Sequence, residues 1–171
     1  MEKNIIKYDE FLSNDLFDEI QMFAEKTLKS PEPYYGRTNA CWREEIVKQS
    51  TPVIVIDIMN DSPIYKKLKS EIDAKTGLVV DRLMIYFWTK LSYISWHNDA
   101  HAEAALTIYL NDYWDFDWGG YFMYEMDNEI KAIKPERNLG IIQTGHVFHS
   151  VSTVNLDSDK RITLQAFFME N

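Results

Sequence analysis

The sequence predicts an α+β fold in which helices come first and a β-rich core follows. Two segments within residues 1–77 carry apolar residues at helical spacing, whereas residues 78–171 contain about eight short runs rich in β-branched and aromatic side chains. Aromatic residues make up 14% of the chain, which suits a core built of strands. We therefore expect one domain, residues 1–171, in which a β core (78–171) has a helical support (1–77) packed on one face.

An amphipathic helix is predicted near the start of the chain. Ser13 or Asn14 can cap it, and it should end near Ser30. Its apolar face is formed by residues at helical spacing: Leu16, Ile20, Phe23, Ala24 and Leu28. The following stretch, PEPYYGRTNACWREE, indicates a loop. In it, Arg43 is interpreted as an ion-paired surface residue and Cys41 as a small buried apolar residue.

A strand and a second helix complete the N-terminal part. VIVIDI, from Val53 to Ile58, is β-branched and predicts a strand. Ser62 is a suitable helix cap with Pro63 in the first turn, and Gly77 ends the helix.

From Leu78 onward the hydrophobic period changes from that of a helix to that of strands. The expected strands are LVVDRLMIYFW, SYISWH, AALTIYLN, YFMYEM, EIKAI, NLGIIQ, HSVSTV and RITLQAFF. Polar, turn-forming stretches separate them. Their number and shortness indicate a sandwich or an open barrel.

Charge and cysteine content limit the partners and the compartment. The chain has 27 acidic and 18 basic residues, and its net charge of -9 would repel a phosphate backbone. Its single cysteine cannot form an intrachain disulfide. The N-terminus lacks a secretory pattern, and the longest apolar run, Leu83 to Trp88, is too short to cross a bilayer. We expect a cytoplasmic protein that binds neither nucleic acid nor membranes.

A metal site is predicted from the histidines and one aspartate. His97 and Asp99 alternate on an extended segment, so they should project to the same side. A third ligand is needed downstream, and His146 and His149 are three residues apart, so at most one can serve. The apolar neighbours of His149 favour it, whereas His146 lies beside Gly145 in a turn-like stretch. Two histidines and one carboxylate form the facial triad typical of non-heme Fe(II) oxygenases.

An anion site is predicted on the last expected strand. Arg161 supplies a planar guanidinium suited to a carboxylate, and Thr163 lies on the same strand face and can add a hydroxyl. A cationic group of this kind fits an anionic cosubstrate bound near the metal.

Six motifs occur in the order found in one family. They are the HxD of His97 to Asp99, the YLN of Tyr109 to Asn111 followed by Trp114, the WGG of Trp118 to Gly120, the KP of Lys134 and Pro135, the HSV of His149 to Val151, and the RIT of Arg161 to Thr163. With these motifs the chain resembles the Fe(II)/2-oxoglutarate-dependent dioxygenases of the prolyl 4-hydroxylase-like branch.

The resemblance implies a double-stranded β-helix, or jelly roll, with iron at its open end. The implied iron ligands are His97, Asp99 and His149. Arg161 would pair with the C5 carboxylate of 2-oxoglutarate, Tyr109 would share that carboxylate, and Tyr86 would play a second such role. Fe(II), 2-oxoglutarate and O2 are the implied cofactors, and ascorbate can be expected to stimulate turnover. Peptidyl proline is the implied substrate.

Other interpretations stay open. The chain could act on another residue or on a small molecule, or it could be a cupin-like metal-binding module without oxygen chemistry, although such a module does not need Arg161. His101 is expected at a strand edge rather than in the metal site. Gly119 and Gly120 could relieve a bulge or tight corner, or could let substrate or cosubstrate approach the backbone. The acidic and aromatic residues 112–118 could wall a peptide groove or simply pack.

Overall fold

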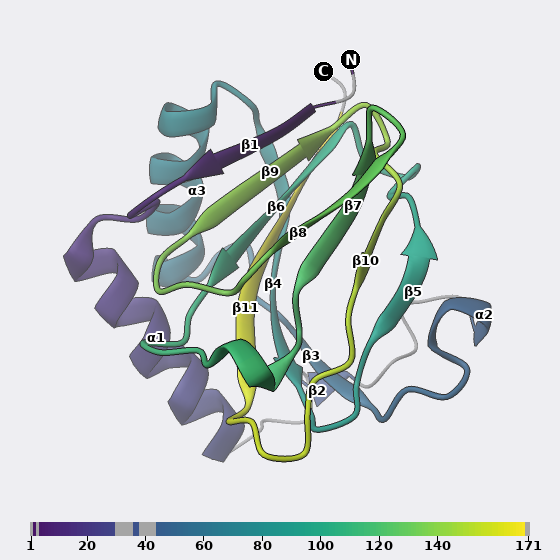
Figure 1. Ribbon diagram of the computed structural model, residues 1–171. Coiled ribbons are helices and arrows are strands. Elements are labelled where there is room, and N and C mark those ends of the chain that lie inside the picture. Colours follow the sequence, from purple (N-terminus) through teal and green to yellow (C-terminus); the bar gives the residue numbers. More distant parts are fainter. Residues whose placement is uncertain (1, 3, 30–35, 38–43, 170–171) are drawn as a thin grey trace.

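Two antiparallel sheets face each other in the computed structural model, which describes residues 2, 4–29, 36–37 and 44–169 (Figure 1). The seven-stranded sheet has the order β1 (Asn4–Tyr8), β9 (Gly140–Thr144), β6 (Ala104–Tyr109), β11 (Arg161–Phe168), β4 (Val80–Trp88), β3 (Val53–Asp57), β2 (Gly36–Arg37). The four-stranded sheet has the order β5 (Ile94–His97), β10 (His149–Val151), β7 (Phe122–Met126), β8 (Glu129–Ile133). Together they form the expected jelly roll.

All eight strands predicted after residue 78 are present, and the N-terminal part adds more strands than expected. The predicted strand of VIVIDI forms β3, whereas β1 and β2 were not predicted. β1 lies at one edge of the large sheet, where Asn4 pairs with Thr144 and Tyr8 with Gly140. The part before residue 78 is therefore a contributor to the sheet as well as a helical support.

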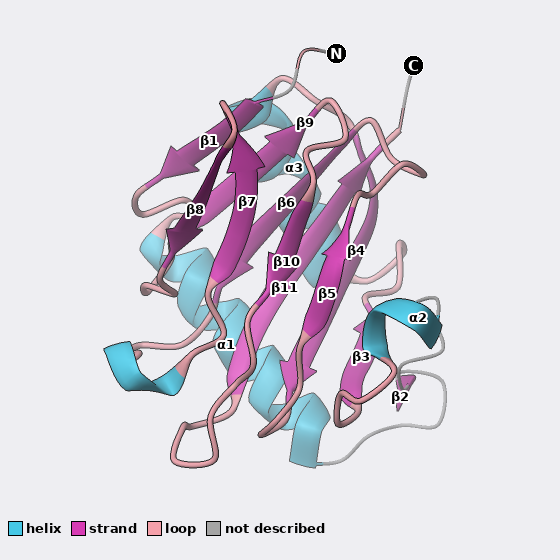
Figure 2. Ribbon diagram, turned by 45° about the vertical axis from the view of Figure 1, so that its right-hand side comes forward, coloured by secondary structure: helices cyan, strands magenta, loops and turns pink. Residues whose placement is uncertain are grey.

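Two helices cover the outer face of the seven-stranded sheet: α1 (Asn14–Lys29) and α3 (Pro63–Thr76) (Figure 2). In α3, the Ser62 side chain accepts a hydrogen bond from the Tyr65 backbone, and Gly77 ends the helix at φ 71°. Both ends agree with the prediction. A short helix, α2 (Glu44–Val47), was not predicted.

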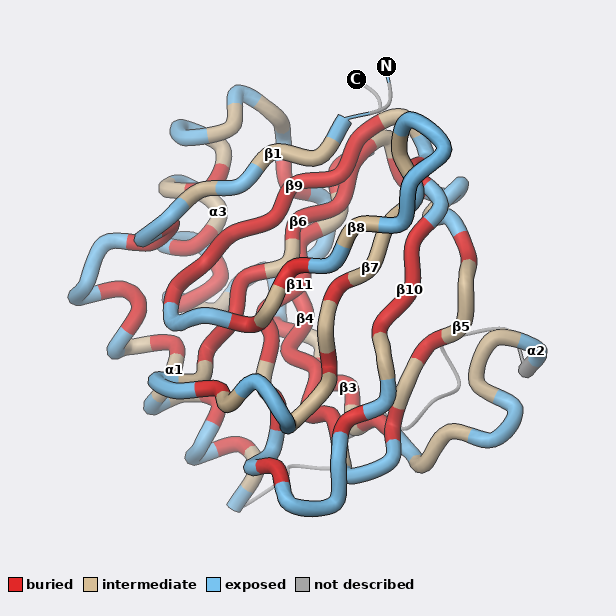
Figure 3. Tube along the Cα trace, in the orientation of Figure 1, coloured by how far each residue is buried: buried red, intermediate tan, exposed pale blue. Residues whose placement is uncertain are grey.

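The main core lies between these helices and the large sheet. From α1 it takes Leu16, Phe17, Ile20 and Ala24, and from β11 it takes Leu164, Ala166 and Phe168. Because side chains alternate along a strand, Arg161, Thr163 and Gln165 point to the other face of β11, between the two sheets. Figure 3 shows that the central strands β9, β6, β11 and β4 are mostly buried.

Some predictions fall outside the described residues, namely those for Cys41 and Arg43. Among the helices that the structure describes, none combines the length and apolar composition needed to cross a membrane. The prediction of a single domain over residues 1–171 stays a prediction.

Candidate active site between the two sheets

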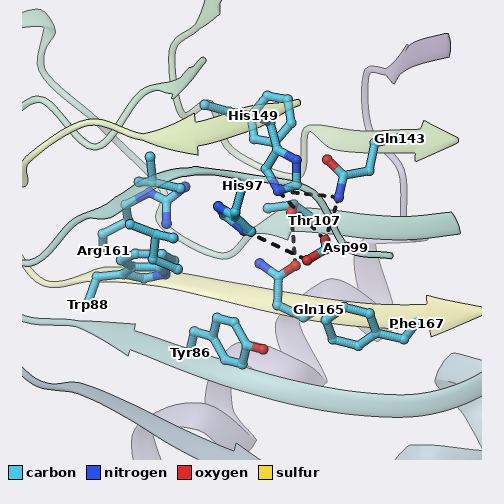
Figure 4. Close-up of a pocket in the computed structure, with 13 residues that line it drawn as sticks. Tyr86, Trp88, His97, Asp99, Thr107, Gln143, His149, Arg161, Gln165 and Phe167 are labelled. Carbon is cyan, nitrogen blue, oxygen red and sulfur yellow. Dashed lines mark hydrogen bonds and ion pairs between the residues drawn. The ribbon is translucent and has the colours of Figure 1, made fainter. Parts of the chain in front are cut away.

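The predicted triad is brought together at the end of the four-stranded sheet. His97 ends β5, His149 begins β10, and the two residues pair directly in the sheet. Asp99 lies two residues beyond β5, outside regular structure. His97 Nε2 is 3.7 Å from Asp99 Oδ1, and His149 Nε2 is 3.7 Å from Asp99 Oδ2 (Figure 4). The three potential ligand atoms lie within 4.8 Å of one another, an arrangement compatible with iron binding.

Backbone carbonyls fix the orientation of both histidine rings. His97 Nδ1 lies 2.7 Å from the Ser95 carbonyl oxygen, and His149 Nδ1 lies 2.9 Å from the Val147 carbonyl oxygen. A carbonyl can only accept, so each Nδ1 donates a hydrogen to it, and Nε2 is the ring nitrogen left to bind a metal. Both rings therefore direct a metal-binding nitrogen toward Asp99.

The other two histidines are not part of the ligand cluster, and His101 lies in the turn after Asp99 rather than at the expected strand edge. His146 is exposed in a turn at φ 55°, and His101 is exposed with its ring 5.3 Å from that of Phe167. Within the described part of the chain, His97, Asp99 and His149 form the one cluster of three or more potential metal ligands.

Arg161 lies in the interior, and the described part of the chain places no opposite charge against it. It is the first residue of β11 and only 1% exposed, and its Cζ lies 4.5 Å from the ring centroid of Trp88 and 5.0 Å from that of Tyr109. Its Nε and Nη1 have no hydrogen-bond partner, and it forms no salt bridge with any described residue. Burial lowers the pKa of this guanidinium, while the nearby Tyr109 opposes that shift. A buried, unpaired guanidinium is costly unless an anion joins it, so this place fits a carboxylate ligand.

The other residues predicted to bind the cosubstrate surround Arg161. Tyr109 is fully buried, its hydroxyl has no hydrogen-bond partner among the described residues, and burial raises its pKa, so it remains a hydrogen-bond donor. Thr163 pairs with both Tyr86 and Tyr109 in the large sheet. Its hydroxyl oxygen accepts hydrogen bonds from Trp88 Nε1 and Gln165 Nε2, each at 3.1 Å.

One cavity connects the triad with Arg161. It is lined by Tyr86, Trp88, Ile94, His97, Asp99, Thr107, Phe122, Gln143, His149, Val151, Arg161, Gln165 and Phe167. Arg161 and Trp88 lie at one side and the triad at the other, with Tyr86 facing the space between (Figure 4). Tyr109 and Thr163 do not line it, so either would act from behind the lining residues.

Gly120 shows why a glycine is required beside Arg161. Its φ is +66°, and a Cβ there would lie 2.8 Å from Arg161 Cδ and 3.3 Å from Arg161 Nε. Gly119 also has a φ of +66°, and its Cβ would meet the Thr153 carbonyl oxygen. The tight corner is therefore present, and Gly120 leaves room for the Arg161 side chain, while a close approach of substrate or cosubstrate stays a prediction.

The acidic and aromatic segment 112–118 does not line this cavity. Trp114 is buried, and its ring packs edge-to-face against that of Trp118, with the ring centroids 5.2 Å apart. Its Nε1 donates a hydrogen bond to the Gly119 carbonyl oxygen. Packing therefore explains these two tryptophans, and a peptide groove walled by this segment stays a prediction.

Several lining residues were not predicted, because their contacts are with residues distant in the sequence. Trp88 covers the Arg161 guanidinium, and Gln143 donates to Asp99. Thr107 donates to Gln165, which in turn donates to Thr163. The available signal for Gln143 and Gln165 was a polar residue inside an otherwise apolar strand.

Comparison with known proteins agrees with this geometry. The model of the 2OG-Fe(II) oxygenase superfamily matches residues 81–169, just over half of the chain. No curated protein sequence is detectably similar to the chain.

Solved structures share the fold over nearly the whole chain. A prolyl-4-hydroxylase from Pseudomonas putida has a TM-score of 0.76 at 16% identity, covering 99% of this chain and 94% of that one. A Trichoplax adhaerens prolyl hydroxylase, in complex with a peptide fragment of the hypoxia inducible factor oxygen degradation domain, has a TM-score of 0.75 at 15% identity, covering 96% and 83%. SnoN, a non-heme alpha ketoglutarate dependent epimerase of nogalamycin biosynthesis, has a TM-score of 0.75 at 12% identity, covering 98% and 79%.

Proposed function

The chain belongs to the 2OG-Fe(II) oxygenase superfamily, and from this premise we propose that it hydroxylates proline residues in peptides. Its membership makes it a dioxygenase that uses Fe(II), 2-oxoglutarate and O2. The proposal adds the roles of individual residues and the class of substrate.

We assign Fe(II) to His97, Asp99 and His149. Two imidazole nitrogens and one carboxylate suit Fe(II) and leave coordination positions open. Bound iron, with 2-oxoglutarate and O2, supplies the oxidant that hydroxylates a substrate C–H bond, with release of succinate and CO2.

The observation that carries the proposal is the unpaired Arg161 in the same cavity as the triad. Its Nε and Nη1 can donate to the distal carboxylate of 2-oxoglutarate, and the Tyr109 hydroxyl can add a third hydrogen bond. Thr163 and Tyr86 complete the pocket, Thr163 from behind and Tyr86 from the cavity wall. A cupin-like module that only binds a metal has no need of this buried cation, so the residues favour the oxygenase.

The choice of proline rests on the similar structures. Two of them are prolyl hydroxylases, and one of these holds a peptide. An alternative, oxidation of a small molecule, is supported by the comparable likeness to the epimerase SnoN. Residues 112–118 do not line the cavity and so do not favour either substrate, and the experiment must separate the two.

The test measures succinate release by the purified protein with Fe(II), 2-oxoglutarate and ascorbate. We expect slow release without substrate and faster release with a proline-containing peptide, and mass spectrometry should show one added oxygen on the proline. The matched control is the same peptide with each proline replaced by alanine. Stimulation by a small molecule with no peptide modified would keep the oxygenase and reject the peptide substrate.

A further inference from the structure

We propose that Gln143 is a positioning residue that orients Asp99 for metal binding. The inference rests on the proposed iron ligands and adds a residue from a strand that supplies none of them. Gln143 lies in β9 of the seven-stranded sheet, whereas His97 and His149 lie in the four-stranded sheet. Its side chain reaches across the interior, and Nε2 donates to Asp99 Oδ2 at 2.6 Å (Figure 4).

Asp99 needs such a partner more than the histidines do. Each histidine belongs to a strand and has its ring fixed by a backbone carbonyl two residues earlier. Asp99 lies beyond the end of β5, and from the described residues its carboxylate receives one hydrogen bond, the one from Gln143. The Gln143 amide therefore fixes the orientation of the Asp99 carboxylate, as the two backbone carbonyls fix the orientation of the imidazole rings.

This hydrogen bond holds a carboxylate whose two oxygens face the two histidines. Oδ2, which accepts from Gln143, lies 3.7 Å from His149 Nε2, and Oδ1 lies 3.7 Å from His97 Nε2. Gln143 Nε2 also lies 3.4 Å from His149 Nε2, the atom that a metal would take. The Gln143 amide thus lies close to two of the three proposed ligands.

Folding alone does not explain a glutamine here. Gln143 is 8% exposed in a strand whose other residues are buried, and its buried Oε1 has no hydrogen-bond partner among the residues that the structure describes. An unpartnered buried oxygen destabilises the folded chain, and Leu or Met would pack without it. A residue that is unfavourable for stability and bonded to a ligand is expected where function needs it.

The experiment titrates Co(II), as a spectroscopic substitute for Fe(II), into metal-free protein and follows its absorption. We expect Gln143→Met, which keeps the chain length but removes both donors, to bind Co(II) about 10- to 100-fold more weakly than the wild type. Gln143→Leu serves as a second variant, and its Tm without metal should be no lower than that of the wild type.

The matched control is Gln165→Met, because Gln165 lines the same cavity but bonds to Thr107 and Thr163 rather than to the triad. It should keep wild-type affinity for Co(II). If Gln165→Met weakens Co(II) binding as much as the Gln143 variants do, repacking of the cavity causes the effect and the role of Gln143 is wrong. Unchanged Co(II) affinity in both Gln143 variants would also contradict that role.

The variant His97→Ala distinguishes a failure of this inference from a failure of the proposed iron ligands. If His97→Ala loses Co(II) binding while the Gln143 variants keep it, the ligand set stands and the role of Gln143 is wrong. If His97→Ala binds Co(II) as the wild type does, the ligand set itself is wrong, and the role of Gln143 falls with it.

Discussion

The triad and the pocket around Arg161 share one cavity but differ in how completely their polar groups are satisfied. Both histidine Nδ1 atoms and the Asp99 carboxylate already have hydrogen-bond partners in the chain. By contrast, Arg161 Nε and Nη1 and the Tyr109 hydroxyl have none among the described residues. The difference indicates that the triad is held in shape by the protein, whereas the arginine pocket is completed only by a ligand.

The two regions also differ in their supports. The triad comes from the end of one strand, the start of another and a loop residue, all at the rim of the four-stranded sheet. The arginine pocket is built on in-register neighbours of the large sheet, where Arg161 pairs with Trp88 and Thr163 with Tyr86 and Tyr109. A substitution in one region should therefore leave the other intact.

The largest effect is expected from the triad. Alanine at His97, Asp99 or His149 should abolish iron-dependent turnover of 2-oxoglutarate, because each change removes one proposed ligand. The rate of succinate release measures this turnover. His101→Ala and His146→Ala are the controls and should retain most activity; an inactive His146→Ala beside an active His149→Ala would contradict the assignment.

A smaller effect is expected from Arg161→Leu. Loss of the charge-assisted hydrogen bonds, worth about 1.5–3 kcal/mol each, should weaken 2-oxoglutarate binding on the order of a hundredfold while Co(II) binding is retained. Calorimetric titration of 2-oxoglutarate into the metal-loaded protein measures this affinity. Arg137→Leu is the matched control, since Arg137 is an exposed arginine paired with Asp18 and Asp112. Unchanged affinity in Arg161→Leu would place the cosubstrate elsewhere.

The smallest of the three effects is expected from Gly120→Ala. A left-handed φ costs a non-glycine residue about 1–2 kcal/mol, and the new Cβ would also push against Arg161. We expect a lower Tm and about tenfold weaker 2-oxoglutarate binding.

Gly77→Ala is its control, because Gly77 has a φ of +71° but open space around it. It should lower the Tm through the same backbone strain and leave 2-oxoglutarate affinity unchanged. Equal loss of affinity in both variants would show that general destabilisation, rather than displacement of Arg161, causes the effect.

Much of this site could be predicted from the sequence, for reasons that particular residues make plain. His97, Asp99, His149 and Arg161 lie within short motifs whose spacing and order can be read directly. The strands after residue 78 were predictable because their period and composition change sharply.

What could not be predicted depends on pairing between distant strands. Trp88 covers Arg161 only because β4 and β11 align in that register, and Gln143 reaches Asp99 only because the two sheets face each other. β1 is a strand because β9 offers it hydrogen bonds, since its five residues, NIIKY, have no decisive pattern of their own.

The pairing of β1 with β9 also bears on how the chain folds. Asn4 meets Thr144, so β1 cannot pair until β9, 140 residues downstream, is available. Contacts so distant in sequence form slowly, because a long loop must close before they stabilise anything. Gln143 lies on β9 and pairs there with Ile5, so the proposed metal site should acquire its final shape only after β1 and β9 have met.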